Sequence, residues 1–201
     1  PTPVPLSGHA FLVDNLRTWA ALAPSEAEAK AFLDKAAAAV QEFGKRFVNA
    51  STGDVTVDGS HPTQTGQSMA LFNDLVAPAM RSKVLSSLLR TVAKSNNHIT
   101  SGMFGIRWLL ETLSANNASD LAWQMVMQED YPHGFISMLN SGATTLWESW
   151  FFSNNAFSHN HPMFSGVVPW AFGTIGGIRV DDDAVGADRL AFRPPPLWAL
   201  G

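Results

Sequence analysis

Residues 25–47 read SEAEAKAFLDKAAAAVQEFGKRF, and this stretch decides the fold class. Its apolar residues recur at steps of three and four, the spacing that places side chains on one face of an α-helix. That face consists of Ala29, Phe32, Ala36, Val40, Phe43 and Phe47. Ser25 and Glu28 form a capping box, which supplies acceptors to backbone N–H groups that have no partner within the helix. The stretch therefore predicts a helix that runs to about residue 48.

The same helical periodicity governs most of the chain on both sides of this stretch. Leu12, Leu16, Trp19 and Ala23 form one stripe of an earlier helix, which Pro24 ends. Further helices are predicted over residues 63–77, 80–93, 102–113, 119–127 and 161–173, with Ser119 as the cap of the helix that it begins. Two short apolar segments, residues 178–180 and 190–192, flank an acidic turn and predict a hairpin. We therefore expect an all-α fold with the start of a β element at its end.

Composition narrows the functional classes. Of the 201 residues, 46% are apolar and only 15% are charged, which excludes a disordered chain and a charged coiled coil. A net charge of −4 removes the electrostatic case for nucleic acid or an anionic membrane as a partner. No apolar run is long enough to span a bilayer. Cysteine is absent, so the chain has no disulfides and no thiolate metal ligands.

Both ends of the sequence predict an excerpt of a longer protein. Prolines at positions 1, 3 and 5 predict a loop or linker, and a proline run at 194–196 follows the last apolar segment directly. The compartment stays open on this evidence. Two Asn-x-Ser patterns, at Asn49 and Asn117, favour an extracellular or secreted protein.

One carboxylate stands alone in the second half of the chain. Between residues 134 and 178, Glu148 is the only acid and there is no Lys or Arg. Trp147 and Trp150 flank it. Such a residue is either exposed on a loop or held in a partly dry pocket, where desolvation would raise its pKa toward a value useful for proton transfer. Both alternatives stay open.

His159, Asn160 and His161 form the second candidate. Two His residues and Glu148 would match a two-His, one-carboxylate metal set, although this spacing is common by chance. A pair of polar groups that contact a ligand is better supported than a metal site, and a structural His with its hydrogen bonds satisfied is an equally supported alternative.

Small polar groups precede two predicted helices, at residues 63–67 (TQTGQ) and 100–102 (TSG). Helix capping accounts for most such patterns. Amides and hydroxyls beside aromatic rings also suit sugar binding, in which rings stack on the apolar sugar face and dipoles contact the hydroxyls.

Several of these segments match one known family in order. They are GATTLWESW at 142–150, SHNHPMF at 158–164, TQTGQ at 63–67, HITSGMFG at 98–105, QEDYP at 128–132 and GIR at 177–179. Together they cover nearly the whole chain. The chain resembles the catalytic domain of α-L-rhamnosidases, glycoside hydrolase family 78.

The resemblance implies an (α/α)6 barrel of inner and outer helices with the sugar bound at one mouth. The readable helices amount to roughly the second half of such a barrel. On this basis residues 1–176 are expected to form the C-terminal half of the catalytic barrel, and residues 177–201 the start of a C-terminal β-sandwich domain. Other chains, or the remainder of the same protein, would complete the barrel.

The resemblance also implies an inverting hydrolase that releases terminal α-L-rhamnose from glycans or glycosides. The general base of the family's A-T-T-x-W-E motif falls on Glu148, and its Asn-His pair falls on Asn160 and His161, with His161 expected to contact rhamnose. Trp147 and Trp150 would form the pocket wall. The general acid would lie upstream of this chain, and no metal or cofactor is expected.

Departures from the family pattern lie near the expected pocket. Residues 131–134 (YPHG) lack an aromatic of the family, and Phe151 and Phe152 follow Trp150 where a polar residue is common. Residues 164–166 read FSG in place of FGS, and Pro169 replaces a frequent Glu. These changes leave open an alternative function as a carbohydrate-binding or structural module that has lost hydrolysis.

Overall fold

The computed structural model describes residues 2–58, 60–130, 132, 134–152, 154, 157–181 and 183–194. Predictions that involve Pro1, Tyr131, His133, Asp182 and residues 195–201 lie outside this set. The chain divides into two compact units, Pro1–Asn96 and Asn97–Gly201. Among the described residues, no helix combines the length and apolar character that a bilayer span needs.

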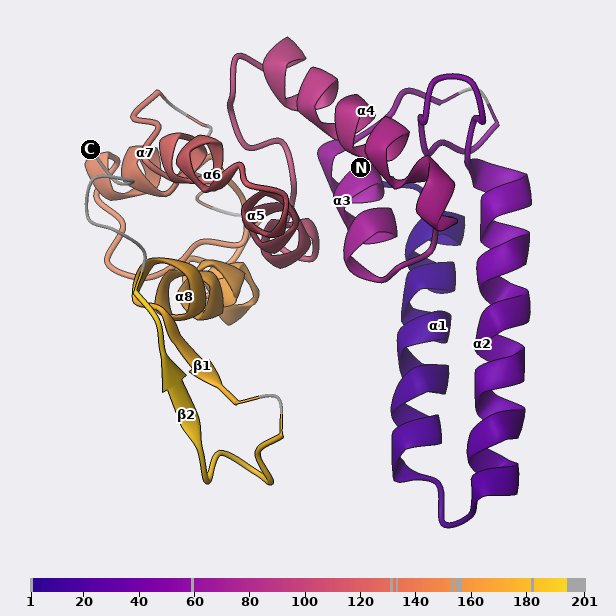
Figure 1. The fold of residues 1–201 in the computed structure, drawn as a ribbon. Coiled ribbons are helices and arrows are strands. Elements are labelled where there is room, and N and C mark those ends of the chain that lie inside the picture. Colours follow the sequence, from indigo (N-terminus) through magenta and orange to yellow (C-terminus); the bar gives the residue numbers. More distant parts are fainter. Residues whose placement is uncertain are drawn as a thin grey trace. The chain divides into compact units, whose positions relative to one another are not determined.

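The first unit begins with two long helices that run antiparallel, α1 (Val4–Leu22) and α2 (Glu26–Phe47) (Figure 1). The predicted cap of α2 is confirmed, because the Ser25 hydroxyl accepts a hydrogen bond from the backbone N–H of Glu28 at 3.3 Å. Ala36, Phe43 and Phe47 of α2 are buried. Ala29, Phe32 and Val40 of the predicted face are half-buried, so the sequence predicted the cap and the bounds of α2 and half of its buried face.

Helix α1 differs from the prediction in its start and in its buried face. It begins at Val4, because Pro5 lies in the first turn, where a missing N–H costs nothing. Its buried residues are Leu6, Ala10, Val13 and Ala20. The predicted stripe lies on a different face, on which Leu12 is 48% exposed and Trp19 is 60% exposed. Helix α1 therefore carries two apolar faces, and only the one with smaller side chains packs within this unit.

The segment between α2 and the buried helix α3 (Gln64–Phe72) includes a tight turn at residues 49–54. Val48 and Val55 form an isolated antiparallel bridge, and the Gln67 side chain donates to the carbonyl of Val55 and accepts from its N–H. The Thr63 hydroxyl caps α3 by accepting from the N–H of Gly66 at 3.0 Å, as the capping interpretation predicts. The helix ends five residues earlier than predicted, because Asp74 adopts a positive φ of 47°.

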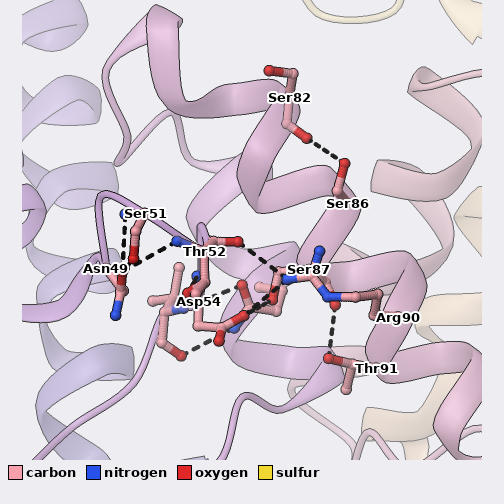
Figure 2. Close-up of polar contacts among 11 residues, drawn as sticks. Asn49, Ser51, Thr52, Asp54, Ser82, Ser86, Ser87, Arg90 and Thr91 are labelled. Carbon is pink, nitrogen blue, oxygen red and sulfur yellow. Dashed lines mark hydrogen bonds and ion pairs between the residues drawn. The ribbon is translucent and has the colours of Figure 1, made fainter.

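Helix α4 (Arg81–Lys94) follows the 3₁₀ turn η1 (Pro78–Met80) and confirms the helix predicted over 80–93. Asp54 anchors the turn at residues 49–54 to α4 (Figure 2), because the Ser87 hydroxyl and the Arg90 guanidinium both donate to Oδ1 of Asp54. Arg90 also donates to the carbonyl of Thr52 at 3.1 Å. Burial raises the pKa of Asp54, but hydrogen bonds with Ser87 and Thr52 and the charge of Arg90 outweigh this effect and lower the pKa below its ordinary value.

The second unit consists of shorter elements (Figure 1). They are α5 (Gly105–Ala115), α6 (Ser119–Val126), α7 (Phe135–Asn140), the 3₁₀ helix η2 (Pro162–Gly166), α8 (Val167–Trp170), the π-helical turn η3 (Ala171–Ile175), β1 (Ile178–Val180) and β2 (Leu190–Phe192). Strands β1 and β2 pair antiparallel, with Ile178 opposite Phe192, so the predicted hairpin is confirmed. Together the two units give a predominantly helical chain that ends in a hairpin.

Two helix predictions in this unit need correction. Ser119 is the first residue of α6 and not its cap; Ala118 holds the cap position and has no side chain that can accept a hydrogen bond. The helix predicted over 161–173 is divided into η2, α8 and η3. Pro169 lies within α8 and has no N–H to donate, which explains why a regular ladder cannot run through this segment.

Candidate active site

Two segments that are distant in sequence run side by side and position Glu148. The backbone N–H of Glu148 donates to the carbonyl of Ser158 at 2.9 Å, and the N–H of His161 donates to the carbonyl of Leu146 at 2.7 Å. The hydroxyl of Thr145 donates to the carbonyl of His159. Residues 145–148 and 158–161 are therefore fixed against each other by three bonds that involve the backbone.

The Glu148 side chain is partly exposed and lies beside an imidazole. Its Oε2 accepts a hydrogen bond from the N–H of Ser158 at 2.8 Å and lies 3.7 Å from Nδ1 of His161. The side chains of Glu148 and His161 are 28% and 24% exposed. The carboxylate is thus held in one place and still reaches solvent, so both alternatives for Glu148 stay open.

The two His residues share one feature. Nε2 of His159 and Nε2 of His161 are buried and have no hydrogen-bond partner among the described residues. A buried polar atom without a partner costs free energy, and ligand-binding sites are one place where this cost is accepted. His161 combines such an atom with its position beside Glu148, and its side chain as a whole is partly exposed.

The two Trp residues beside Glu148 are both buried. Trp150 donates from Nε1 to the carbonyl of Ser101 at 2.7 Å and packs edge-on against Phe135 and Phe164, with ring centroids at 5.1 and 4.3 Å. Trp147 packs against His159 instead, at 5.3 Å. Both Trp residues support the Glu148 segment from the interior of this unit.

Asn160 follows the Ser158 turn and is exposed. Its backbone N–H donates to the hydroxyl of Ser158 at 3.1 Å. The structure thus brings Glu148 and His161 together and places Asn160 between His159 and His161 on the same segment. Sequence reasoning missed Ser158 as the donor to Glu148, because no local pattern links two residues that lie ten positions apart in irregular structure.

The metal alternative finds no support in the part of the chain that the structure describes. No group of three His, Cys, Asp or Glu side chains gathers there as a metal would require, and His159, His161 and Glu148 do not form one. Residues 100–102 do not cap α5, whose cap position is Phe104. The carbonyl of Ser101 serves as the acceptor for Trp150 instead.

Comparisons with known proteins agree on one family. The family described as "bacterial alpha-L-rhamnosidase 6 hairpin glycosidase domain" matches residues 2–175. An alpha-L-rhamnosidase of Formosa agariphila is 32% identical over 130 residues, which are 65% of this chain and 13% of that protein. One of Streptomyces avermitilis is 28% identical over 155 residues, 73% of this chain and 14% of that protein. The matched part of the chain thus spans only about a seventh of the length of these relatives.

Solved structures lead to the same fold. The S. avermitilis alpha-L-rhamnosidase complexed with L-rhamnose superposes with a TM-score of 0.85 and 25% identity, over 97% of this chain and 19% of that one. The Dictyoglumus thermophilum alpha-L-rhamnosidase superposes with a TM-score of 0.81 and 28% identity, over 92% of this chain and 21% of that one. The expected fold class, part of an (α/α)6 barrel with a C-terminal hairpin, is confirmed. This chain belongs to the bacterial α-L-rhamnosidase six-hairpin glycosidase domain family.

Proposed function

We propose that this chain supplies the general base and part of the sugar pocket of an inverting glycoside hydrolase that releases terminal α-L-rhamnose. Membership of the family supports a glycoside hydrolase-like function and a rhamnose-containing substrate. One observation carries the assignment of the base: Glu148 is held by the N–H of Ser158 and remains partly exposed. It is also the acid of the A-T-T-x-W-E motif.

In this proposal Glu148 takes a proton from a water molecule as that water attacks the anomeric carbon. Inversion needs a second carboxyl group, which protonates the leaving oxygen from the opposite face of the sugar. The two groups lie about 6.5–9.5 Å apart in inverting enzymes, which leaves room for the water. We assign that acid to a part of the parent protein outside this chain, so residues 1–201 alone should be inactive.

The neighbouring residues receive supporting roles. His161 contacts the bound rhamnose from its partly exposed side chain beside Glu148, and Asn160 contacts it from the same segment. Trp147 and Trp150 form the wall behind Glu148, where both are buried. The division into residues 1–176 as barrel and 177–201 as the start of a β domain belongs to the same proposal.

The rest of the barrel would cover the apolar face that α1 leaves exposed. That face includes Leu12 and Trp19 on the predicted stripe, and Phe11 and Leu22 are also exposed. Soluble monomers rarely leave such a contiguous apolar face bare. We therefore expect α1 to pack against further helices of the parent protein.

A second candidate function is a carbohydrate-binding module without hydrolysis. The observation in its favour is the exposure of Phe151 and Phe152, close to half of each side chain, directly after the Glu148 motif. An apolar rim of this kind suits binding to a sugar face and supplies no group for proton transfer.

Hydrolysis of an aryl α-L-rhamnoside by the full-length protein that contains this chain separates the two functions. We expect turnover with release of the β-anomer of rhamnose, which proton NMR detects in the first minutes. Glu148→Gln should lower kcat by at least ~100-fold, because the amide cannot take the proton from water. Absence of hydrolysis, or a Gln variant with the wild-type rate, would overturn the assignment.

A further inference from the structure

His159 lies between two aromatic rings of the segment that carries Glu148. Its imidazole is 5.3 Å from the Trp147 ring and 4.6 Å from the Phe152 ring, tilted by 37° and 33°. Trp147 and Phe152 also meet each other edge-on at 5.3 Å. The three rings form one closed cluster, which we name the ring clamp.

The backbone of His159 is tied to the same segment. The Thr145 hydroxyl donates to its carbonyl, and the preceding residue, Ser158, donates its N–H to Oε2 of Glu148. Trp147–Glu148 and Ser158–His159 are therefore two adjacent pairs that face each other. Trp147 and His159 belong to the ring clamp, and Ser158 donates the hydrogen bond that holds the Glu148 carboxylate.

We propose that His159 is a positioning residue for Glu148, acting through the ring clamp. This inference rests on the proposed function, in which Glu148 is the general base. Three packed rings allow little relative movement of residues 147 and 159, because aromatic pairs prefer particular distances and angles. The Glu148 carboxylate is restrained together with these residues, because its Oε2 accepts a hydrogen bond from the N–H of Ser158.

In this proposal the flat ring of His159 performs this task without a contribution from Nε2. Nε2 is buried without a hydrogen-bond partner among the described residues, so it makes no polar contact that could orient Glu148. A phenylalanine would fill the same space against Trp147 and Phe152 without burying an unpaired polar atom. Ring shape and nitrogen chemistry can therefore be separated by substitution.

Turnover should be affected more than affinity. The base acts on water in the transition state, and a small displacement of a catalytic group costs up to about 100-fold in rate. Contacts to the bound sugar come from other side chains in the proposal, His161 among them. We expect kcat to fall about 10- to 100-fold in His159→Ala, with KM within threefold of wild type.

The decisive variant is His159→Phe, which restores the clamp. In the full-length protein it should return kcat to within threefold of wild type and raise the melting temperature. His9→Ala is the matched control, because His9 also packs against two rings, Phe43 at 6.2 Å and Phe47 at 5.2 Å, but belongs to the first unit. It should lower the melting temperature and leave kcat within twofold.

The outcomes separate this inference from the assignment of the base. If Glu148→Gln is slow and His159→Ala keeps wild-type kcat, only the positioning role is overturned. If His159→Phe is as slow as His159→Ala, the nitrogen matters and the ring clamp is overturned. If His159→Ala does not fold, the kcat of His159→Phe decides alone. A Glu148→Gln variant at the wild-type rate overturns both proposals together.

Discussion

Asp54 and Glu148 are two carboxylates at turns, and their surroundings differ in one respect. Oδ1 of Asp54 accepts from the Ser87 hydroxyl and from the Arg90 guanidinium, and its own turn supplies a contact with Thr52 (Figure 2). Within the part of the chain that the structure describes, Glu148 accepts one hydrogen bond, from the N–H of Ser158. An ionised carboxylate can accept about four. Several acceptor sites of the Asp54 carboxylate are thus taken by hydrogen bonds within the protein, whereas the Glu148 carboxylate keeps acceptor sites at which a water molecule could bind.

The difference separates a structural acid from a candidate catalytic one. The partners of Asp54 come from the turn at residues 49–54 and from α4, so its role is to join two elements. The neighbour of Glu148, His161, lies at 3.7 Å and presents a second nitrogen that is unpartnered. The hydrogen bonds of Asp54 thus join two elements, whereas Glu148 has one such bond and stays a candidate for the catalytic role.

The strongest test of this comparison is to neutralise each acid in turn. Glu148→Gln should lower kcat on an aryl rhamnoside by at least ~100-fold and leave the melting temperature nearly unchanged. Asp54→Asn should do the reverse, with wild-type kcat and a lower melting temperature. Steady-state kinetics and calorimetry on the full-length protein measure both. The comparison fails if both variants lose activity to the same extent.

The next effect concerns two glycines with similar backbone conformations. Gly53 has φ of +76°, and a Cβ there would lie 2.4 Å from the backbone carbonyl of Lys83 in α4. Gly142 has φ of +89° and open space around it. Gly53→Ala should cost about 2–4 kcal/mol, the sum of conformational strain and overpacking against backbone. Gly142→Ala should cost only about 1 kcal/mol, from the conformation alone.

Denaturant unfolding of the full-length protein, monitored in each unit by hydrogen exchange, measures these costs. Protection should fall in α4 for Gly53→Ala and change little in the second unit. Equal costs for the two variants would mean that the turn at residues 49–54 does not pack against α4 as closely as the structure indicates.

Local signals predicted the elements whose causes are local. The Ser25 and Thr63 caps could be predicted because their partners lie three residues away, and the hairpin at 178–192 because two apolar segments flank an acidic turn. Helix α1 was predicted with the wrong buried face, since periodicity reveals an apolar stripe but not which partner covers it. The local pattern does not indicate what covers the second stripe, which includes Leu12 and Trp19.

The candidate site was predictable only in part for the same reason. Glu148 and His161 could be selected from their motifs and from the absence of other charges nearby. Their approach to 3.7 Å, and the bond from Ser158, arise from pairing across irregular structure. Neither helical nor strand periodicity encodes such pairing. The burial of Trp150 beneath Phe135 and Phe164 is a tertiary contact of the same kind.

A smaller effect is expected at His161. His161→Ala removes the partly exposed imidazole beside Glu148 that is proposed to contact rhamnose. Because that contact exists in the bound ground state as well as in the transition state, both affinity and rate should suffer. We expect kcat/KM to fall about 10-fold, the loss of roughly one hydrogen bond, with part of it in KM. Calorimetric titration with L-rhamnose and steady-state kinetics separate the two parts, and an unchanged KM would contradict the contact.

The smallest effect is a pH dependence that belongs to Asp54 and should be absent from its Asn variant. The pKa of Asp54 is lowered in the folded protein, because hydrogen bonds with Ser87 and Thr52 and the charge of Arg90 outweigh the effect of burial. Unfolding returns the group to an ordinary value near 3.8, so the unfolded state binds a proton more readily. The stabilisation is therefore complete above pH 3.8 and disappears as the pH falls through the lower folded pKa. At neutral pH, Asp54→Asn should destabilise by about 1 kcal/mol, and this difference should shrink toward zero in acid. Hydrogen exchange of α4 amides, compared between wild type and variant from pH 6 to pH 3, follows the change locally. A difference that stays constant over that range would show that the Asp54 charge contributes nothing to the union of its turn with α4.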